Sequence, residues 1–143
     1  MNAITITKEV RESHAAHYLS AGLAVLPIPL VAKDPKKSGK SPERPDWPAT
    51  ALRIPAQLNG QFANPCNIGV LLGQASGGLL DVDLDCPEAV ALADQFLPST
   101  PAVFGRTGKP RSHRLYIATG VVPTRKFTDG KRGTLLELRG EKA

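Results

Sequence analysis

Three aspartates alternate with aliphatic residues in the segment 78–85, Gly-Leu-Leu-Asp-Val-Asp-Leu-Asp. This period of two predicts a β-strand with one apolar face and an opposite face that carries Asp81, Asp83 and Asp85. Successive carboxylates on that face would lie about 6.5–7 Å apart, and like charges at this spacing repel unless something positive lies over them. Carboxylate oxygens are natural ligands of hard divalent metal ions, so the segment predicts a metal site. The alternative is an exposed strand with solvated aspartates, although aspartate is disfavoured in strands.

A second group of reactive residues lies at 105–114, where glycines are mixed with basic and hydroxyl side chains. We expect a loop that binds a polyphosphate through backbone N–H groups and cationic side chains. The residues that would contact the phosphates are Arg106, Lys109, Arg111, Ser112 and His113. The glycine and lysine spacing of a P-loop is absent, and a solvated basic turn is the alternative interpretation.

Glu137 adds a further carboxylate in the segment 134–139, whose alternation predicts another strand. Carboxylates from two strands can hold two metal ions, which can clamp a triphosphate and activate a 3′-hydroxyl group for in-line attack. The acidic strand, the basic loop and Glu137 together predict the chemistry of nucleotidyl transfer.

The composition bounds the kind of protein in which this chemistry would operate. With 143 residues, 41% of them hydrophobic, the chain suits one domain (1–143), and 13 glycines with 13 prolines favour a loop-rich α/β or α+β fold. The net charge of +5 suits a partner that carries phosphates. Cys66 and Cys86 match no zinc pattern, and we expect reduced thiols. The sequence shows no signal peptide and no apolar run of transmembrane length, so we expect a soluble, cytoplasmic protein without a membrane partner.

The N-terminal half is expected to hold a helix and two strands. Thr7 can cap a helix from about Lys8 to Ala21, with Gly22 as its stop. The segments 23–29 and 67–72 have the apolar character of short buried strands.

A polar, proline-rich loop at 32–49 separates these strands and is too long for a plain connector. Trp47, the one tryptophan of the chain, would anchor this loop or stack on a base. A mobile, solvated loop is the alternative interpretation. The lysines that would contact DNA phosphates are Lys33, Lys36, Lys37 and Lys40.

The C-terminal half is expected to contain the site. A tight turn at 73–78 would join the strand 67–72 to the acidic strand as a hairpin. Pro87 favours the start of a helix, whose apolar face continues to about Leu97. Further strands are expected at 100–104, 113–118 and 134–139, and a basic turn at 123–133.

The chain resembles the bifunctional primase–polymerase domain of the archaeo-eukaryotic primase superfamily, as found in plasmid and phage replication proteins. The first helix, the segment 22–27 and the lysine- and tryptophan-containing loop are similar to the opening of that family. The segments 67–70 and 78–85 resemble its first motif, a hydrophobic strand with Asp-x-Asp or Asp-x-Glu. Ser-His-Arg-Leu-Tyr at 112–116 is similar to its second motif, and Leu-Glu-Leu-Arg-Gly at 136–140 to its third.

The resemblance implies a metal-dependent, template-directed DNA primase and polymerase that uses nucleoside triphosphates with magnesium or manganese. It implies an α/β (α+β) primase–polymerase fold, in which an RNA-recognition-like antiparallel catalytic sheet packs beside an N-terminal α/β unit. Asp81, Asp83, Asp85 and Glu137 would be the catalytic and metal-binding residues, and His113 with the basic loop would bind the nucleotide. The implied partners are a DNA template and a helicase, either on the same polypeptide or separate.

Three features qualify the resemblance. Two Asp-x-Asp pairs overlap, so the metal pair is either Asp81 with Asp83 or Asp83 with Asp85. Ser112 directly precedes His113, where the family pattern has one residue between them. The chain ends just after the third motif, so we expect the native protein to be longer and leave the activity of this fragment open.

Two alternatives from other classes remain. One is a nucleic-acid-binding replication module with a degenerate or incomplete active site, although a pure binding module has no need for converging carboxylates. The other is a different Asp-x-Asp enzyme, such as a phosphatase or a sugar transferase that uses a metal-bound nucleotide. The residues that follow Asp83 and Asp85 fit a haloacid-type phosphatase poorly.

Overall fold

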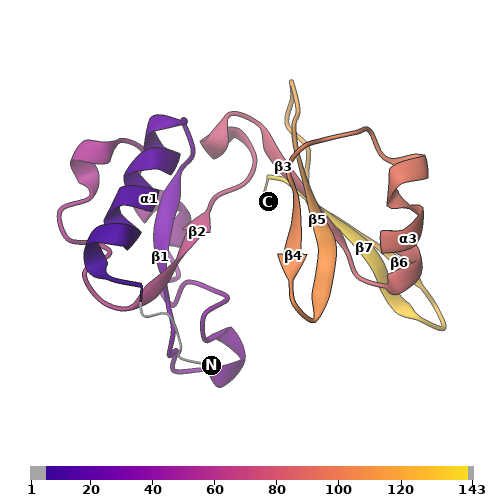
Figure 1. Cartoon of the computed structure of the whole chain (residues 1–143), viewed down its shortest axis with the longest axis horizontal. Helices are drawn as coiled ribbons and strands as arrows, with labels where there is room; N and C mark the ends of the chain where they lie inside the picture. The colour runs from indigo at the N-terminus through magenta and orange to yellow at the C-terminus, as the bar shows by residue number, and fades with distance from the viewer. Residues whose placement is uncertain (1–5, 142–143) are drawn as a thin grey trace. The chain divides into compact units, whose positions relative to one another are not determined.

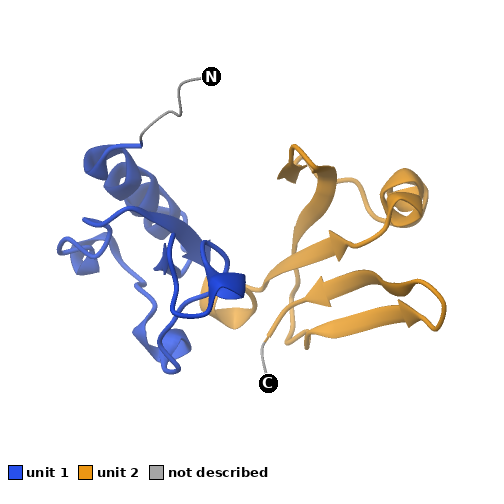
Figure 2. Cartoon of the chain, turned by 90° about the horizontal axis from the view of Figure 1, so that it is seen from below, with its two compact units in different colours: residues 1–71 blue, residues 72–143 orange. Residues whose placement is uncertain are grey.

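The structure is a computed structural model that describes residues 6–141. The chain divides into two compact units, one ending at Leu71 and the other beginning at Leu72 (Figure 2). Each unit has its own antiparallel sheet, so the fold is of mixed α/β type with antiparallel sheets (Figure 1). Within the described residues, no helix is both long enough and apolar enough to cross a membrane.

The first unit opens with α1 (Lys8–Ser20), which confirms the predicted helix. The hydroxyl oxygen of Thr7 accepts a hydrogen bond from the backbone N–H of Val10 at 3.4 Å, as an N-cap residue should. The chain leaves the helix through Gly22, whose φ of 81° is a left-handed conformation that favours glycine.

The sheet of the first unit consists of β1 (Val25–Pro29) and β2 (Cys66–Val70), which pair antiparallel. Both strands fall on predicted segments. The predicted hairpin between β2 and the acidic strand is wrong, because β2 pairs with β1 and the acidic strand joins the other sheet. Apolar residues of α1 and β1 form the core against which β2 packs, and this tertiary contact overrides adjacency in the sequence.

The long segment between β1 and β2 contains short helical turns rather than a further strand. These turns are η1 (Pro35–Lys37), α2 (Trp47–Thr50) and η2 (Pro55–Gln57). The polar, irregular character predicted for 32–49 is confirmed, and the lysines of this stretch are exposed.

Arg11 ties α1 to the segment that precedes β2. Its side chain is buried, and its guanidinium donates hydrogen bonds to the backbone carbonyls of Phe62 at 3.1 Å, Ala63 at 3.0 Å and Ile6 at 2.6 Å. Buried carbonyl groups need such donors, and a charged donor forms the stronger bond. Arg11 is therefore a structural residue of the first unit.

The second unit is built on a five-stranded antiparallel sheet in the order β4-β5-β3-β7-β6 (Figure 1). The predicted acidic strand is the central strand, and all six of its residues are buried. The strands are β3 (Leu79–Leu84), β4 (Val103–Arg106), β5 (Lys109–Ile117), β6 (Arg125–Asp129) and β7 (Gly133–Arg139).

Two segments expected to be loops contain strands. The segment 105–112 is largely a β4–β5 hairpin, whose turn is confined to Thr107 and Gly108. The segment 123–133 holds β6, an edge strand of the sheet. Both expectations are wrong for one reason: glycine, proline and basic residues interrupt the two segments, which therefore lack the apolar alternation by which a strand is recognised.

The helix α3 (Pro87–Phe96) covers the apolar face of this sheet. Cys86 caps the helix, because its Sγ accepts a backbone N–H bond from the first turn at 3.4 Å. Val82 and Leu84 of β3 pack against Ala93 of the helix. Since successive strand residues point to opposite faces, the aspartates of β3 lie on the face that α3 leaves uncovered.

Replacement of Arg11 by leucine should destabilise the first unit by roughly 2–4 kcal/mol, because the buried carbonyl of Phe62 and two part-buried carbonyls would lose a charged donor. Urea denaturation followed by Trp47 fluorescence would measure the change in unfolding free energy. Lys8→Leu on the same helix is the control, since it removes only a half-exposed 3.9 Å ion pair with Glu12, worth about 0.5 kcal/mol or less. Equal losses for the two variants would contradict a structural role for Arg11.

Candidate active site

Asp83 lies at the centre of a row that crosses the whole sheet. It is directly opposite His113 of β5 on one side and Glu137 of β7 on the other. Phe104 of β4 is opposite His113, and Lys126 of β6 is opposite Glu137. Residues opposite one another in antiparallel strands point to the same face. We call these five residues the central row.

Asp81 lies beside the central row on the same face of β3, opposite Arg139 of β7 and Leu115 of β5. Asp81 and Asp83 are only 7% and 5% exposed, although both carry ionisable groups. Burying a carboxylate costs several kcal/mol unless charges or hydrogen bonds compensate for the lost water. The surroundings of this pair must therefore supply cations.

Arg139 and Lys109 supply those cations. A terminal nitrogen of Arg139 lies 2.6 Å from Asp83, its Nε donates to Glu137 at 3.1 Å, and its other terminal nitrogen lies 3.7 Å from Asp81. The ammonium group of Lys109 lies 2.7 Å from Asp85 and 3.3 Å from Asp83. The predicted need for a positive charge over the aspartates is thus met by side chains from both flanking strands.

His113 adds a third contact to the buried aspartates. Its Nδ1 lies 2.9 Å from an oxygen of Asp81 and 3.8 Å from Asp83. Its ring also stacks on Phe104, with centroids 5.0 Å apart and planes 15° from parallel. These contacts fix the imidazole on two sides, and the bond at Nδ1 leaves Nε2 as the nitrogen that can face a substrate.

The pKa values of the site reflect a balance between burial and charge. Burial raises the pKa of the Asp81 carboxyl above its ordinary value, against the opposing charges of His113 and Arg139. Burial alone would lower the pKa of Lys109, but its hydrogen bond to Asp85 and the charge of Asp83 outweigh this effect and raise it. Lys109 therefore stays charged at neutral pH.

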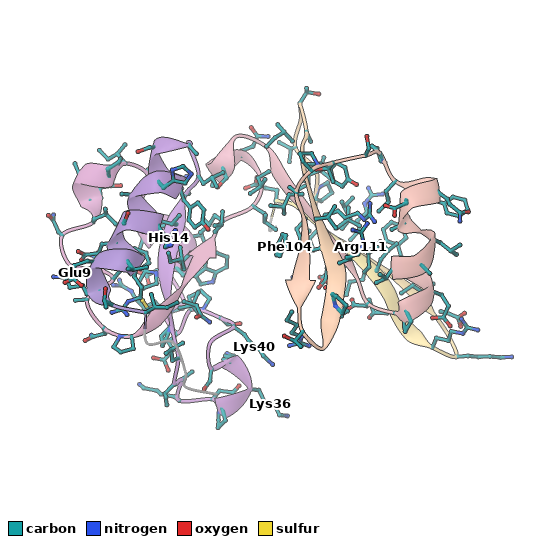
Figure 3. All side chains as sticks on the ribbon, in the orientation of Figure 1. Glu9, His14, Lys36, Lys40, Phe104 and Arg111 are labelled. Atoms are coloured by element: carbon teal, nitrogen blue, oxygen red, sulfur yellow. The ribbon has the colours of Figure 1, made fainter. Side chains whose placement is uncertain are left out.

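The structure does not bring every predicted site residue into this cluster. Ser112 is buried on the opposite face of β5, where its hydroxyl has no hydrogen-bond partner among residues 6–141. Arg111, labelled in Figure 3, pairs at 3.3 Å with Asp94 of α3, which also pairs at 2.6 Å with the buried Arg114. These contacts attach β5 to α3 instead of facing the carboxylates.

Arg106 and Asp85 lie at the edge of the cluster. Asp85 follows the end of β3 and contacts Lys109. Arg106, Asp85 and Lys109 line a cavity of about 520 Å³ beside the β4–β5 hairpin. Among the described residues, Arg106 makes no ion pair of its own, so its charge is available to a ligand in this cavity.

Three residues of the site were missed by the sequence reasoning: Arg139, Phe104 and Lys126. Arg139 carries a local signal, because it stands two residues after Glu137 and must share its face. Phe104 and Lys126 carry no local signal, because their place in the central row depends on strand registers that include irregular steps.

The carboxylates suit a hard divalent metal by chemical type. Asp81, Asp83 and Glu137 offer oxygen donors from adjacent strands, which magnesium and manganese prefer. At their present positions, no three acidic, histidine or cysteine side chains among residues 6–141 converge as a metal-binding group. Lys109 and Arg139 occupy the oxygens that a metal ion would need.

A family model described as bifunctional DNA primase/polymerase, N-terminal, matches residues 15–143. The chain belongs to this family. The match spans both units and includes every strand of the five-stranded sheet. No curated protein and no solved structure matches the chain. Membership associates the chain with DNA primase/polymerase function in DNA replication, and implies DNA and nucleotides as substrates.

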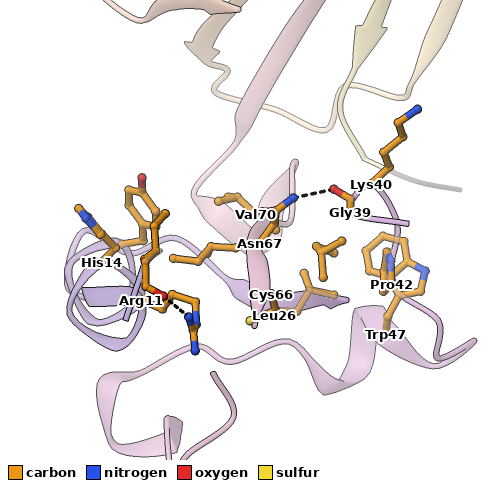
Figure 4. A pocket seen from close by; sticks show the side chains of 15 residues that line it. Arg11, His14, Leu26, Gly39, Lys40, Pro42, Trp47, Cys66, Asn67 and Val70 are labelled. Atoms are coloured by element: carbon orange, nitrogen blue, oxygen red, sulfur yellow. Dashed lines mark hydrogen bonds between the residues drawn. The ribbon is translucent and has the colours of Figure 1, made fainter. Parts of the chain in front are cut away.

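The first unit of this primase/polymerase family domain contains a separate cavity of about 640 Å³ (Figure 4). Lys40 and Trp47 line it on one side, and His14 and Tyr18 of α1 also contribute to its wall. Asn67 of β2 donates a hydrogen bond to the carbonyl of Gly39 at 2.9 Å, which attaches the lysine-containing loop to the sheet. The cavity is therefore both aromatic and basic.

The raised pKa of Asp81 predicts a pH-dependent effect of Asp81→Asn. Folding binds the Asp81 proton more tightly, so the parent should lose stability relative to the variant as the pH rises from about 4 through the folded pKa. The advantage of the variant should be greatest at neutral pH and vanish in acid. Unfolding free energies measured between pH 3 and pH 8 would test this, and a difference independent of pH would contradict it.

Proposed function

We propose that the chain is the catalytic part of a DNA primase and polymerase that performs template-directed nucleotidyl transfer. The observation that carries the proposal is the central row, in which the buried Asp83 stands between His113 and Glu137 on the sheet face that α3 leaves uncovered. Asp81 lies beside it on the same face. Family membership supplies the reaction class, and the row supplies residues of the types that this reaction needs.

We propose Asp81, Asp83 and Glu137 as the principal holders of magnesium or manganese. When bound, such ions neutralise charge on a triphosphate and increase the acidity of an attacking hydroxyl group. Asp81 and Asp83 are favoured over Asp83 and Asp85 as the aspartate pair, because both lie within β3 and both approach His113. Asp85 stands beyond the strand end and would assist from the edge.

Lys109, His113 and Arg139 are the proposed nucleotide-binding groups. Lys109 and Arg139 pair with carboxylates in this structure, and the same nitrogens can bind phosphate oxygens once the carboxylates have another partner. Arg106 would add charge from the adjoining cavity. Arg111 and Ser112 would act through the packing of β5, since they lie on the helix side.

The expected RNA-recognition-like fold of the catalytic sheet is consistent with this proposal. An antiparallel sheet with a helix on one face and a polar opposite face supports an RNA-recognition-like catalytic sheet. A helicase partner and a plasmid or phage origin stay predictions from the resemblance.

Replacement of Asp83 by asparagine should reduce primer synthesis and primer extension with manganese by about a hundredfold or more, because one carboxylate common to both candidate pairs is lost. Manganese binding, measured by electron paramagnetic resonance, should fall in the same variant. Asp129→Asn, at the end of β6, is the matched control and should change neither. Nucleotide incorporation by Asp83→Asn at the parental rate would contradict a catalytic role for Asp83, and a parent that incorporates no nucleotide would favour a binding module without catalysis.

We also propose that the lysines of the first unit contact the template. Lys33, Lys36, Lys37 and Lys40 are exposed on one loop, beside the cavity that Lys40 and Trp47 line. Lys36 and Lys40 are labelled in Figure 3. Exposed cations near an aromatic side chain are the usual elements of a single-strand binding surface.

The double replacement of Lys36 and Lys40 by glutamine should weaken binding of a single-stranded oligonucleotide. It should also reduce the slope of log affinity against log salt by about 0.7 per lysine, because fewer counterions are released. Fluorescence anisotropy over a salt series would measure both quantities. Lys131→Gln, an exposed lysine in the β6–β7 turn, is the control, and an equal slope change per lysine there would contradict a role specific to the loop.

A further inference from the structure

Phe104 is an exposed aromatic residue at the end of the central row. It is 51% exposed, yet it lies on the same sheet face as the buried carboxylates. One face of its ring stacks on His113 at a centroid distance of 5.0 Å. Much of the rest of the ring is open to solvent, so Phe104 offers an apolar surface next to a group of charges.

Phe104 does not belong to the apolar core. The core of the second unit lies under α3, on the other face of the sheet, and is formed by Val82, Leu84 and Ala93. Phe104 also stands on β4, an edge strand with a free side. Burial of apolar surface in the fold therefore does not explain a large aromatic residue at this position.

An irregular hairpin holds Phe104 in register with His113. Pairing between β4 and β5 shifts between Phe104 and Arg106. A side chain at Gly105 would collide with the backbone of Lys109 and Arg111, so this close approach of the two strands requires glycine. The same hairpin thus places Phe104 against His113 and the ammonium group of Lys109 against the aspartates.

We propose that the stacked pair of Phe104 and His113 is the platform for the base of the incoming nucleoside triphosphate. This inference rests on the proposed function and adds a base subsite to it. Phe104 and Asp83 are two strands apart, about 10 Å by the spacing of strands. A nucleotide laid across the row can therefore stack its base on Phe104 while its phosphates reach Lys109 and Arg139.

The chemistry of stacking suits a polymerase. Every base has a π-face, so an aromatic platform accepts all four bases, whereas hydrogen bonds to a base edge would select one. Aromatic residues on the open face of an antiparallel sheet are a known means of stacking nucleobases. The platform would hold each incoming nucleotide and leave the choice among them to the template.

The experiment compares a nucleoside triphosphate with inorganic tripolyphosphate, which carries the phosphates without a base. Binding of each to the full chain, with manganese, is measured by calorimetry for the parent, Phe104→Leu and Phe104→Tyr. Phe104→Leu should weaken nucleoside triphosphate binding roughly five- to a hundredfold, the range for loss of one stacked base, and leave tripolyphosphate binding unchanged. Phe104→Tyr, which keeps a ring, should resemble the parent with both ligands.

Phe127→Leu is the matched control. Phe127 is 48% exposed on the other edge strand, and it pairs with Leu136 on the helix side of the sheet. Its replacement should change neither ligand.

Two outcomes would overturn the inference while the proposed function stands. Equal weakening of both ligands by Phe104→Leu would show that Phe104 acts by positioning His113, and unchanged binding of both would show that no base rests there. A parent that binds neither ligand would overturn the proposed function itself.

Discussion

The burial of two carboxylates in the central strand is the constraint on which the second unit depends. Asp81 and Asp83 point to the face that α3 leaves uncovered, yet they are almost fully buried, so side chains of the flanking strands must bring compensating charge to them. Arg139 comes from β7, and Lys109 and His113 come from β5. A shift of either flanking strand by one residue would move these groups to the face under α3. Charge therefore helps to fix the register that also brings Glu137 beside Asp83.

Local signals in the sequence were sufficient for several elements of the fold. Thr7 and Gly22 mark the ends of α1, and strict alternation identifies β3 and the face on which its aspartates lie. Alternation likewise places Glu137 and Arg139 on one face of β7. The motif residues His113 and Glu137 could be proposed as partners of Asp83, but their direct opposition to it could not, because strand register is a property of non-local pairing.

The remaining errors share that origin. The apolar pattern of β2 is compatible with pairing to either β1 or β3. The core that β2 forms with α1 determines that it pairs with β1. The hairpin of β4 and β5 was expected to be a loop because glycine and basic residues dominate it. Gly105 allows the close approach of the two strands, and Lys109 contacts the aspartates in this structure. Gly105 and Lys109 thus stabilise a compact hairpin, which could not be predicted from their residue types alone.

The pairing of acidic and basic side chains also bears on how this face would accept a nucleotide. Four carboxylates, those of Asp81, Asp83, Asp85 and Glu137, lie with the three permanent cations Lys109, Arg139 and Lys126. If divalent ions and a triphosphate arrive together, the carboxylates can exchange their present cations for the metal ions, and the basic side chains can exchange their carboxylates for phosphate oxygens. No buried charge is then left unpaired. Entry of either component alone would leave such a charge. Under the proposed function, metal and nucleotide would therefore load together, and Phe104, the uncharged end of the central row, would stay available to the base.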